Sequence, residues 1–133
     1  MSLIVDASVA VKWIAAEDDS SRAVALLTRE QLIAPDLIIA EVGNAMWKKF
    51  RKGWLARVQI IEGMERLPKC FDRMVPTLDL ASRALELALA QDHAIYDCFY
   101  LALAERESLP IVTADQRLLA AGRKLGTIEA RPL

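Results

Sequence analysis

Short apolar runs alternate with longer stretches of helical periodicity along the chain. The runs predict short strands at positions 3–5, 32–34, 71–75, 111–113 and 126–129. The periodic stretches predict helices at positions 8–16, 20–30, 36–52, 56–66, 80–91, 96–107 and 116–124. Gly53 and Pro68 follow two of these helices, and both are typical helix terminators.

This alternation of strands and helices predicts a parallel sheet covered on both faces. The expected fold class is therefore α/β, a three-layer α/β/α arrangement with a central sheet of short strands. The helix at 96–107 is apolar nearly all round, which predicts that it is buried. Sheets of this kind bind ligands beyond the carboxyl ends of their strands, near a switch in strand order.

The composition fits one domain spanning residues 1–133, with a hydrophobic fraction of 54% that is enough for a proper core. The formal net charge of -1 gives no overall signal of nucleic-acid binding. If a metal neutralises some of the acids, the remaining surface is more basic than this total suggests. No P-loop and no glycine-rich dinucleotide turn is present.

The two cysteines, Cys70 and Cys98, have no spacing typical of a zinc site, and both lie in apolar surroundings. We expect two buried thiols in a reducing compartment. No basic segment precedes a long apolar run at the N-terminus, and no stretch reaches the roughly 18 apolar residues of a membrane helix. The expected localisation is cytoplasmic.

Four acidic residues lie beside strongly apolar segments. Asp6 and Asp115 follow strand-like runs, whereas Glu41 and Asp97 lie inside apolar helical stretches. A carboxylate next to buried apolar surface is costly unless a partner neutralises it. Several converging carboxylates are the usual ligands of Mg²⁺ or Mn²⁺. The pattern therefore indicates metal-dependent phosphoryl chemistry.

Each acid also has an ordinary structural interpretation. Asp6, Asp97 and Asp115 stand where they can cap helices, and Glu41 can face solvent on one stripe with Asn44 and Lys48. A parallel sheet nevertheless brings Asp6 and Asp115 to one edge, which Asp97 at a helix start can also face. Ser8 and Thr113 add hydroxyl groups beside the two strand ends. The pattern alone does not place Glu41 with the others.

The same residues fall in four segments that match a known family in order and spacing. They are LIVDAS at 3–8, APDL leading into AEVGNA at 34–45, IYDCFYLALA at 95–104 and IVTAD at 111–115. In these segments the chain resembles the PIN-domain ribonucleases, among them the small VapC-type toxins of toxin–antitoxin pairs. The resemblance covers nearly the whole chain. One departure is Cys98, where the family usually has alanine, a residue of similar size.

The resemblance implies that Asp6, Glu41, Asp97 and Asp115 are the metal-binding and catalytic acids, supported by Ser8, Asn44 and Thr113. It implies a Mg²⁺- or Mn²⁺-dependent endoribonuclease that leaves a 5′-phosphate and a 3′-hydroxyl. It further implies a homodimer and a VapB-like antitoxin partner. Two alternatives remain open. One is a PIN-like RNA-processing nuclease without an antitoxin, and the other is a non-catalytic module that binds RNA or protein.

A dense basic cluster provides a candidate RNA contact. Lys48, Lys49, Arg51 and Lys52 are interleaved with Trp47, Phe50 and Trp54, and phosphate-binding cations beside stacking rings suit single-stranded RNA. The alternative is a solvated helix end whose tryptophans pack in the core.

His93 is the only histidine, so no histidine pair is available for metal-free acid–base catalysis. We interpret it as a loop residue.

Overall fold

A central parallel sheet organises the computed structural model, which describes all residues from 1 to 133. Its strands are β1 (Ser2–Val5), β2 (Gln31–Pro35), β3 (Arg73–Val75), β4 (Ile111–Thr113) and β5 (Ala130–Pro132), in the order β3-β2-β1-β4-β5. Every neighbouring pair is parallel. The predicted α/β class with a short-stranded parallel sheet is confirmed.

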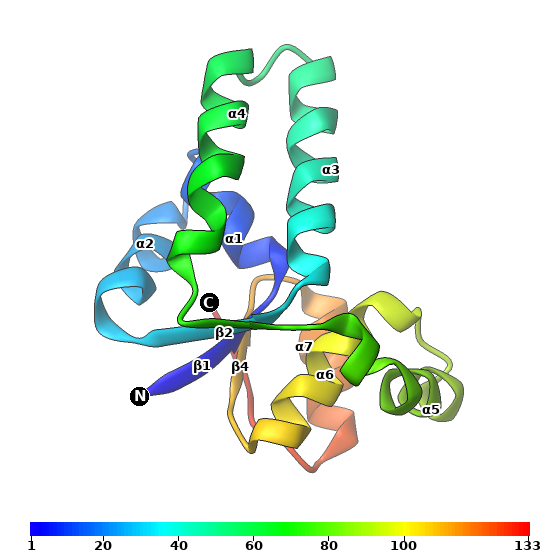
Figure 1. The fold of residues 1–133 in the computed structure, drawn as a ribbon. Helices are drawn as coiled ribbons and strands as arrows, with labels where there is room; N and C mark the ends of the chain where they lie inside the picture. Colours follow the sequence, from blue (N-terminus) through cyan, green and yellow to red (C-terminus); the bar gives the residue numbers. More distant parts are fainter.

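Helices cover both faces of this sheet (Figure 1). One layer holds α1 (Ala7–Ile14), α2 (Ser20–Arg29), α3 (Leu37–Arg51) and α4 (Arg57–Arg66). The other holds α5 (Ala81–Gln91), α6 (Ile95–Glu107) and α7 (Gln116–Leu125). Short 3-10 turns at Leu67–Cys70 and Thr77–Asp79 flank β3. Figure 1 shows α3 and α4 as an antiparallel pair, the α3–α4 hairpin, that projects away from the sheet.

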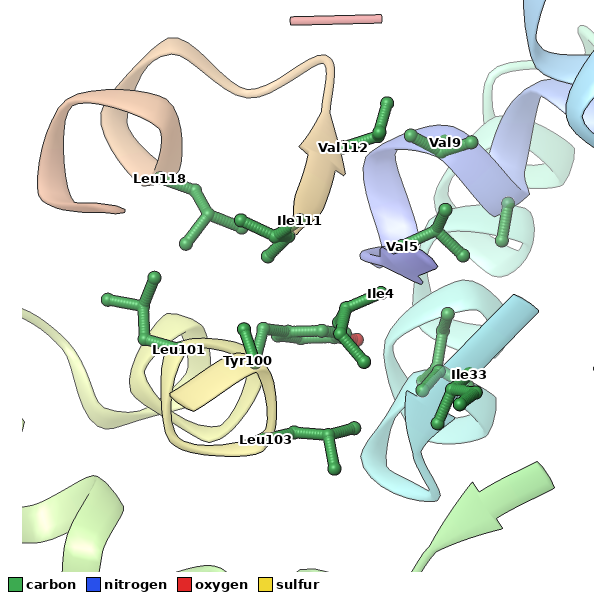
Figure 2. Close-up of a cluster of buried hydrophobic side chains, with 14 of the residues drawn as sticks. Ile4, Val5, Val9, Ile33, Tyr100, Leu101, Leu103, Ile111, Val112 and Leu118 are labelled. Atoms are coloured by element: carbon green, nitrogen blue, oxygen red, sulfur yellow. The ribbon is translucent and has the colours of Figure 1, made fainter. Parts of the chain in front are cut away.

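The core packs against both faces of the sheet, and on one face it is formed largely by α6, the helix predicted to be buried. Six of its residues are buried, and the Tyr100 ring lies next to Ile4 of β1 (Figure 2). Leu101 and Leu103 extend the same apolar cluster, which also includes Leu118 of α7. Packing on several sides explains why α6 lacks a polar face.

Two strands differ from the prediction by two residues or more. The last strand was predicted at 126–129, but β5 occupies Ala130–Pro132 and residues 126–129 lead into it. Pro132 argues against a strand in sequence, yet β5 is an edge strand, where a missing N–H is tolerated. β3 begins at Arg73 rather than position 71, because Phe71 closes the preceding 3-10 turn through its N–H to the carbonyl of Pro68.

The cysteine prediction is half right. Cys98 is buried in α6, whereas Cys70 is only partly buried, at the end of a 3-10 turn. Leu67 and Phe71 near it in sequence are buried, whereas Cys70 lines a surface hollow and is only partly covered. None of the helices combines the length and apolar character that a membrane span requires.

Candidate active site

The switch in strand order creates the candidate site. β1 and β4 are neighbours in register, with Ile4 opposite Ile111 and Val5 opposite Val112, so the two strands end within one residue of each other. The chain leaves β1 for β2 on one side and leaves β4 for β5 on the other. Asp6 and Asp115 follow these two ends, which is where open parallel sheets bind ligands.

Asp6 lies at the base of the site and is 5% exposed. It occupies the position before α1, but its side chain makes no capping hydrogen bond, so the capping interpretation is wrong for this residue. The Ser8 hydroxyl donates to Asp6 Oδ1 at 2.7 Å. Burial raises the pKa of Asp6 from 3.8 to about 7, against the opposing hydrogen bond from Ser8, and the charge of Asp97 adds to the rise.

A small hydroxyl network ties the start of α1 to the end of β4. Ser8 Oγ lies 3.3 Å from Thr113 Oγ1 and accepts the Ala114 N–H at 2.9 Å. Thr113, which is 1% exposed, accepts the Asp115 N–H at 3.0 Å. Ser8 and Thr113 therefore fix the position of both strand-end acids, which suits the supporting role predicted for them.

Glu41 reaches the site from the first turns of α3. Its Oε1 accepts a 2.6 Å hydrogen bond from the hydroxyl of Tyr100 on α6, so the solvent-facing interpretation is wrong. Burial raises the pKa of Glu41, the Tyr100 hydrogen bond opposes this, and the charges of Asp97 and Asp115 raise it further. Burial and the nearby Glu41 also hold the pKa of Tyr100 well above 10.0, so its hydroxyl stays a donor.

The remaining two acids each have a fixed partner. Asp97, in the first turn of α6, has its Oδ2 2.7 Å from His93 Nε2. Asp115 caps α7, because its Oδ1 accepts the N–H groups of Arg117 at 2.8 Å and Leu118 at 3.4 Å. The capping interpretation is therefore right for Asp115, although this does not remove it from the site, since one carboxylate oxygen is left over.

The charges of the four acids lie close together but do not converge on one point. Asp6 is affected by Asp97, and Glu41 by both Asp97 and Asp115, so the charges are close enough to repel. His93 is the only basic side chain that pairs with any of them. No three of the acidic, histidine or cysteine side chains are gathered tightly enough to ligate an ion. The oxygen-only carboxylate set fits Mg²⁺ or Mn²⁺ in donor chemistry.

The structure thus brings Asp6, Glu41, Asp97 and Asp115 to one region, and their catalytic and metal-binding roles stay predictions. Asn44 is exposed and makes no side-chain hydrogen bond, so its supporting role is also still a prediction. Sequence reasoning missed two residues that bind these acids. Tyr100 stands three residues after Asp97, a spacing that places both on one side of α6. No helical spacing signals His93, because it lies before the helix begins. His93 lies in a loop, as expected, and its ring pairs with Asp97.

The basic cluster lies on the outer half of α3 and in the turn before α4. Trp47 and Trp54 are 50% and 64% exposed, so the alternative that these tryptophans pack in the core is wrong. Arg51 lies over the Trp47 ring at 4.8 Å and Lys52 over the Trp54 ring at 4.5 Å. Lys49 differs from the others, since its ammonium group pairs with Glu17 at 3.2 Å.

Comparison with known proteins identifies the family. The family model described as "PIN domain" matches residues 3–124, which include all four acids. The chain belongs to the PIN-domain family. Among curated PIN relatives, Ribonuclease VapC3 of Pyrobaculum aerophilum is 31% identical over 89% of this chain and 92% of its own length. Exonuclease VapC9 of the same organism is 32% identical over 79% of this chain and 76% of its own length.

Solved structures share the PIN fold. The crystal structure of PAE2754 from Pyrobaculum aerophilum has a TM-score of 0.75 and 25% identity, covering 98% of this chain and 83% of that one. The structure of VapBC2 from Rickettsia felis, bound to a promoter DNA fragment, has a TM-score of 0.71 with 12% identity. That match covers 100% of this chain and 99% of the other, and at this identity it shows the fold alone.

Proposed function

We propose that this protein is a metal-dependent endoribonuclease and the toxin of a VapBC-type toxin–antitoxin system. One observation carries the proposal. Four mutually repelling carboxylates surround the strand-order switch of a PIN domain, and no lysine or arginine pairs with any of them. The resemblance to proteins named Ribonuclease VapC supports RNA as the substrate and toxin as the biological role.

Asp6, Glu41, Asp97 and Asp115 would hold Mg²⁺, with Mn²⁺ as the alternative. Such an ion supplies an activated water and stabilises charge on the phosphodiester oxygens. The protein's own residues position the acids. The Ser8–Thr113 network holds Asp6 and Asp115 at one level, and Tyr100 orients Glu41 across the sheet edge. Burial of Asp6 excludes water around its carboxylate and strengthens its attraction for a cation.

The proposal includes a VapB-like antitoxin and a homodimer. The resemblance to proteins named Ribonuclease VapC supports the antitoxin. Exposed leucines on one side of the molecule support the homodimer. Leu85 and Leu89 of α5 are 50% and 75% exposed, and Leu78 just before α5 is 85% exposed. A monomer in light scattering at micromolar concentration would contradict the dimer.

The deciding experiment is cleavage of linear and circular RNA by wild type and by Asp6→Asn. The panel holds single-stranded and structured RNA, each with Mg²⁺, with Mn²⁺ and with EDTA. We expect wild type to cut both linear and circular RNA only with metal, and Asp6→Asn to cut neither. Since a circle has no end, its cleavage separates an endonuclease from an exonuclease, the activity named for one relative.

The other outcomes assign the remaining possibilities. Cleavage of linear RNA alone would establish a PIN exonuclease instead. Cleavage that persists in EDTA would contradict the metal-dependent chemistry. Failure of folded, metal-loaded protein to cut any RNA would support a binding module. Growth arrest on expression, relieved by a protein encoded beside the gene, would distinguish a toxin from an RNA-processing nuclease.

A further inference from the structure

The outer half of α3 carries a depression of about 240 Å³ lined by Lys48, Arg51 and Lys52 alone. All three side chains are exposed, and none has a carboxylate partner, whereas the adjacent Lys49 is paired with Glu17. Three unpaired cations around one hollow repel one another and attract an anion. We call these three residues the cationic pocket.

The cationic pocket is aligned with the acidic site along α3. Lys48 follows Glu41 by seven residues, about two helical turns, and Lys52 follows it by eleven, about three turns. Glu41, Lys48 and Lys52 therefore lie on one stripe of the helix. The pocket therefore begins about 10 Å from Glu41 along the helix axis. Figure 1 shows α3 running outward from the sheet edge without a break, so the stripe forms a straight path.

The surroundings of the cationic pocket favour a nucleic-acid strand over an acidic peptide. Two exposed indole rings flank it, with Arg51 over Trp47 and Lys52 over Trp54. Bases stack on such rings regardless of sequence, which an acidic peptide does not exploit. The acidic site repels phosphate, so much of the affinity for RNA has to come from cations elsewhere.

We propose that Lys48, Arg51 and Lys52 form a second phosphate-binding subsite for the RNA strand. A strand whose scissile phosphodiester lies at the carboxylates places a phosphate a few nucleotides away in the cationic pocket, with neighbouring bases on Trp47 and Trp54. This inference rests on the proposed RNA-cleaving function. It assigns a role to Lys48, Arg51 and Lys52 and withholds it from Lys49, the fourth cation predicted from the sequence to bind RNA.

The first test measures affinity for a fluorescein-labelled single-stranded RNA by anisotropy, without metal and in the Asp6→Asn background. The pocket variant is Lys48→Gln, Arg51→Gln and Lys52→Gln. Its control removes three exposed cations elsewhere, as Arg29→Gln, Lys69→Gln and Arg123→Gln, and reaches the same net charge. We expect the pocket variant to bind at least about 10-fold more weakly and to lose about 2 units of salt slope, while the control changes neither.

The second test separates this subsite from the active site. With Asp6 restored and metal present, cleavage of long RNA by the pocket variant should show a raised KM and a retained kcat. An RNA too short to reach the cationic pocket should be cleaved equally by the variant and wild type. Circular dichroism melting verifies that both variants fold.

Each remaining outcome has one meaning. Equal salt slopes for the pocket and control variants, with RNA cleavage intact, would overturn the subsite and leave the nuclease standing. Loss of binding to an acidic antitoxin segment but not to RNA would assign the pocket to the protein partner and overturn it as well. Folded wild type that neither binds nor cleaves RNA would instead overturn the proposed function.

Discussion

The acidic site and the α3–α4 hairpin are assembled in different ways. The site draws its carboxylates from the ends of two strands and the starts of two helices, and each carboxylate is held by a donor such as Ser8 or Tyr100. The hairpin cations come from one helix and the adjoining turn, and most point freely into solvent. Rigid, partly buried groups suit bond cleavage, whereas adaptable surface cations suit binding of a flexible strand.

The largest expected effect separates catalysis from stability within the acidic site. Asp97→Asn keeps the hydrogen bond to His93 but removes a charge, so cleavage should fall by at least about 100-fold. Because one repelling carboxylate is gone, the melting temperature of the metal-free protein should stay level or rise. Cleavage assays and thermal melts measure both, with Asp18→Asn, an exposed acid outside the site, as the control.

A marked fall in the melting temperature of Asp97→Asn, beyond that of the control, would assign Asp97 to the scaffold. The contrast between a catalytic acidic site and a binding hairpin would then not hold for Asp97, because its role would be to stabilise a helix start. Undiminished cleavage in a well-folded Asp97→Asn protein would exclude this residue from the catalytic set.

The next effect is a pH dependence of stability in the metal-free protein. The pKa of Asp6 is about 7 in the folded chain against 3.8 when exposed, so the folded state holds the extra proton between pH 4 and 7. Its stabilising effect is present below pH 4 and is lost as pH rises through 7. A shift of this size corresponds to up to about 4 kcal/mol, and relaxation of the site reduces the expected loss to about 2 kcal/mol.

Chemical denaturation at pH 5 and pH 8 measures this loss, and the same pair of measurements on Asp6→Asn isolates it from other titrating groups. The variant should show no difference in unfolding free energy between the two pH values. Addition of Mn²⁺ at pH 8 should raise the stability of the wild-type protein but not that of the variant. An identical pH dependence in both proteins would show that burial of Asp6 does not store this energy. The exposed cations of the hairpin should give no comparable pH dependence of stability.

A smaller effect tests whether Tyr100 orients Glu41. Tyr100→Phe removes the donor to Glu41 Oε1 while keeping the buried ring, which costs about 1 kcal/mol. We expect about fivefold weaker activation by Mn²⁺, with kcat recovered at saturating metal. Mn²⁺ titrations of cleavage measure this split. A lower kcat at saturating metal, with unchanged half-saturation, would argue against a positioning role.

Sequence reasoning reached the fold and the location of the site by the same route. The apolar runs predicted the strands, and the strand ends then brought Asp6 and Asp115 to one edge, as the register of β1 and β4 shows. The last strand was misplaced because β-branched Thr127 and Ile128 favoured a strand, and Pro132 argued against one. On an edge strand neither preference decides the outcome.

The side-chain partners in the site could not be predicted from the sequence. Tyr100 and Glu41 are 59 positions apart, and only the packing of α6 beneath β1 and β2 brings the hydroxyl within reach. Pairing likewise distinguishes Lys49 from its neighbours, since Glu17 lies in the loop after α1. Local periodicity places residues on a helix face but carries no information about which distant charge meets them.

The smallest effect sharpens the comparison within the hairpin itself. Lys49→Gln breaks an ion pair with Glu17, which also accepts a 2.6 Å bond from Lys12, so the loss of stability should stay near 0.5 kcal/mol, the order expected for exposed pairs. RNA affinity should change less than about twofold, whereas Lys48→Gln, equal in charge removed, should weaken it several-fold. Anisotropy titrations of the two single variants measure the difference. Equal losses would mean that net charge alone, and not the pairing seen in the structure, decides which lysines bind RNA.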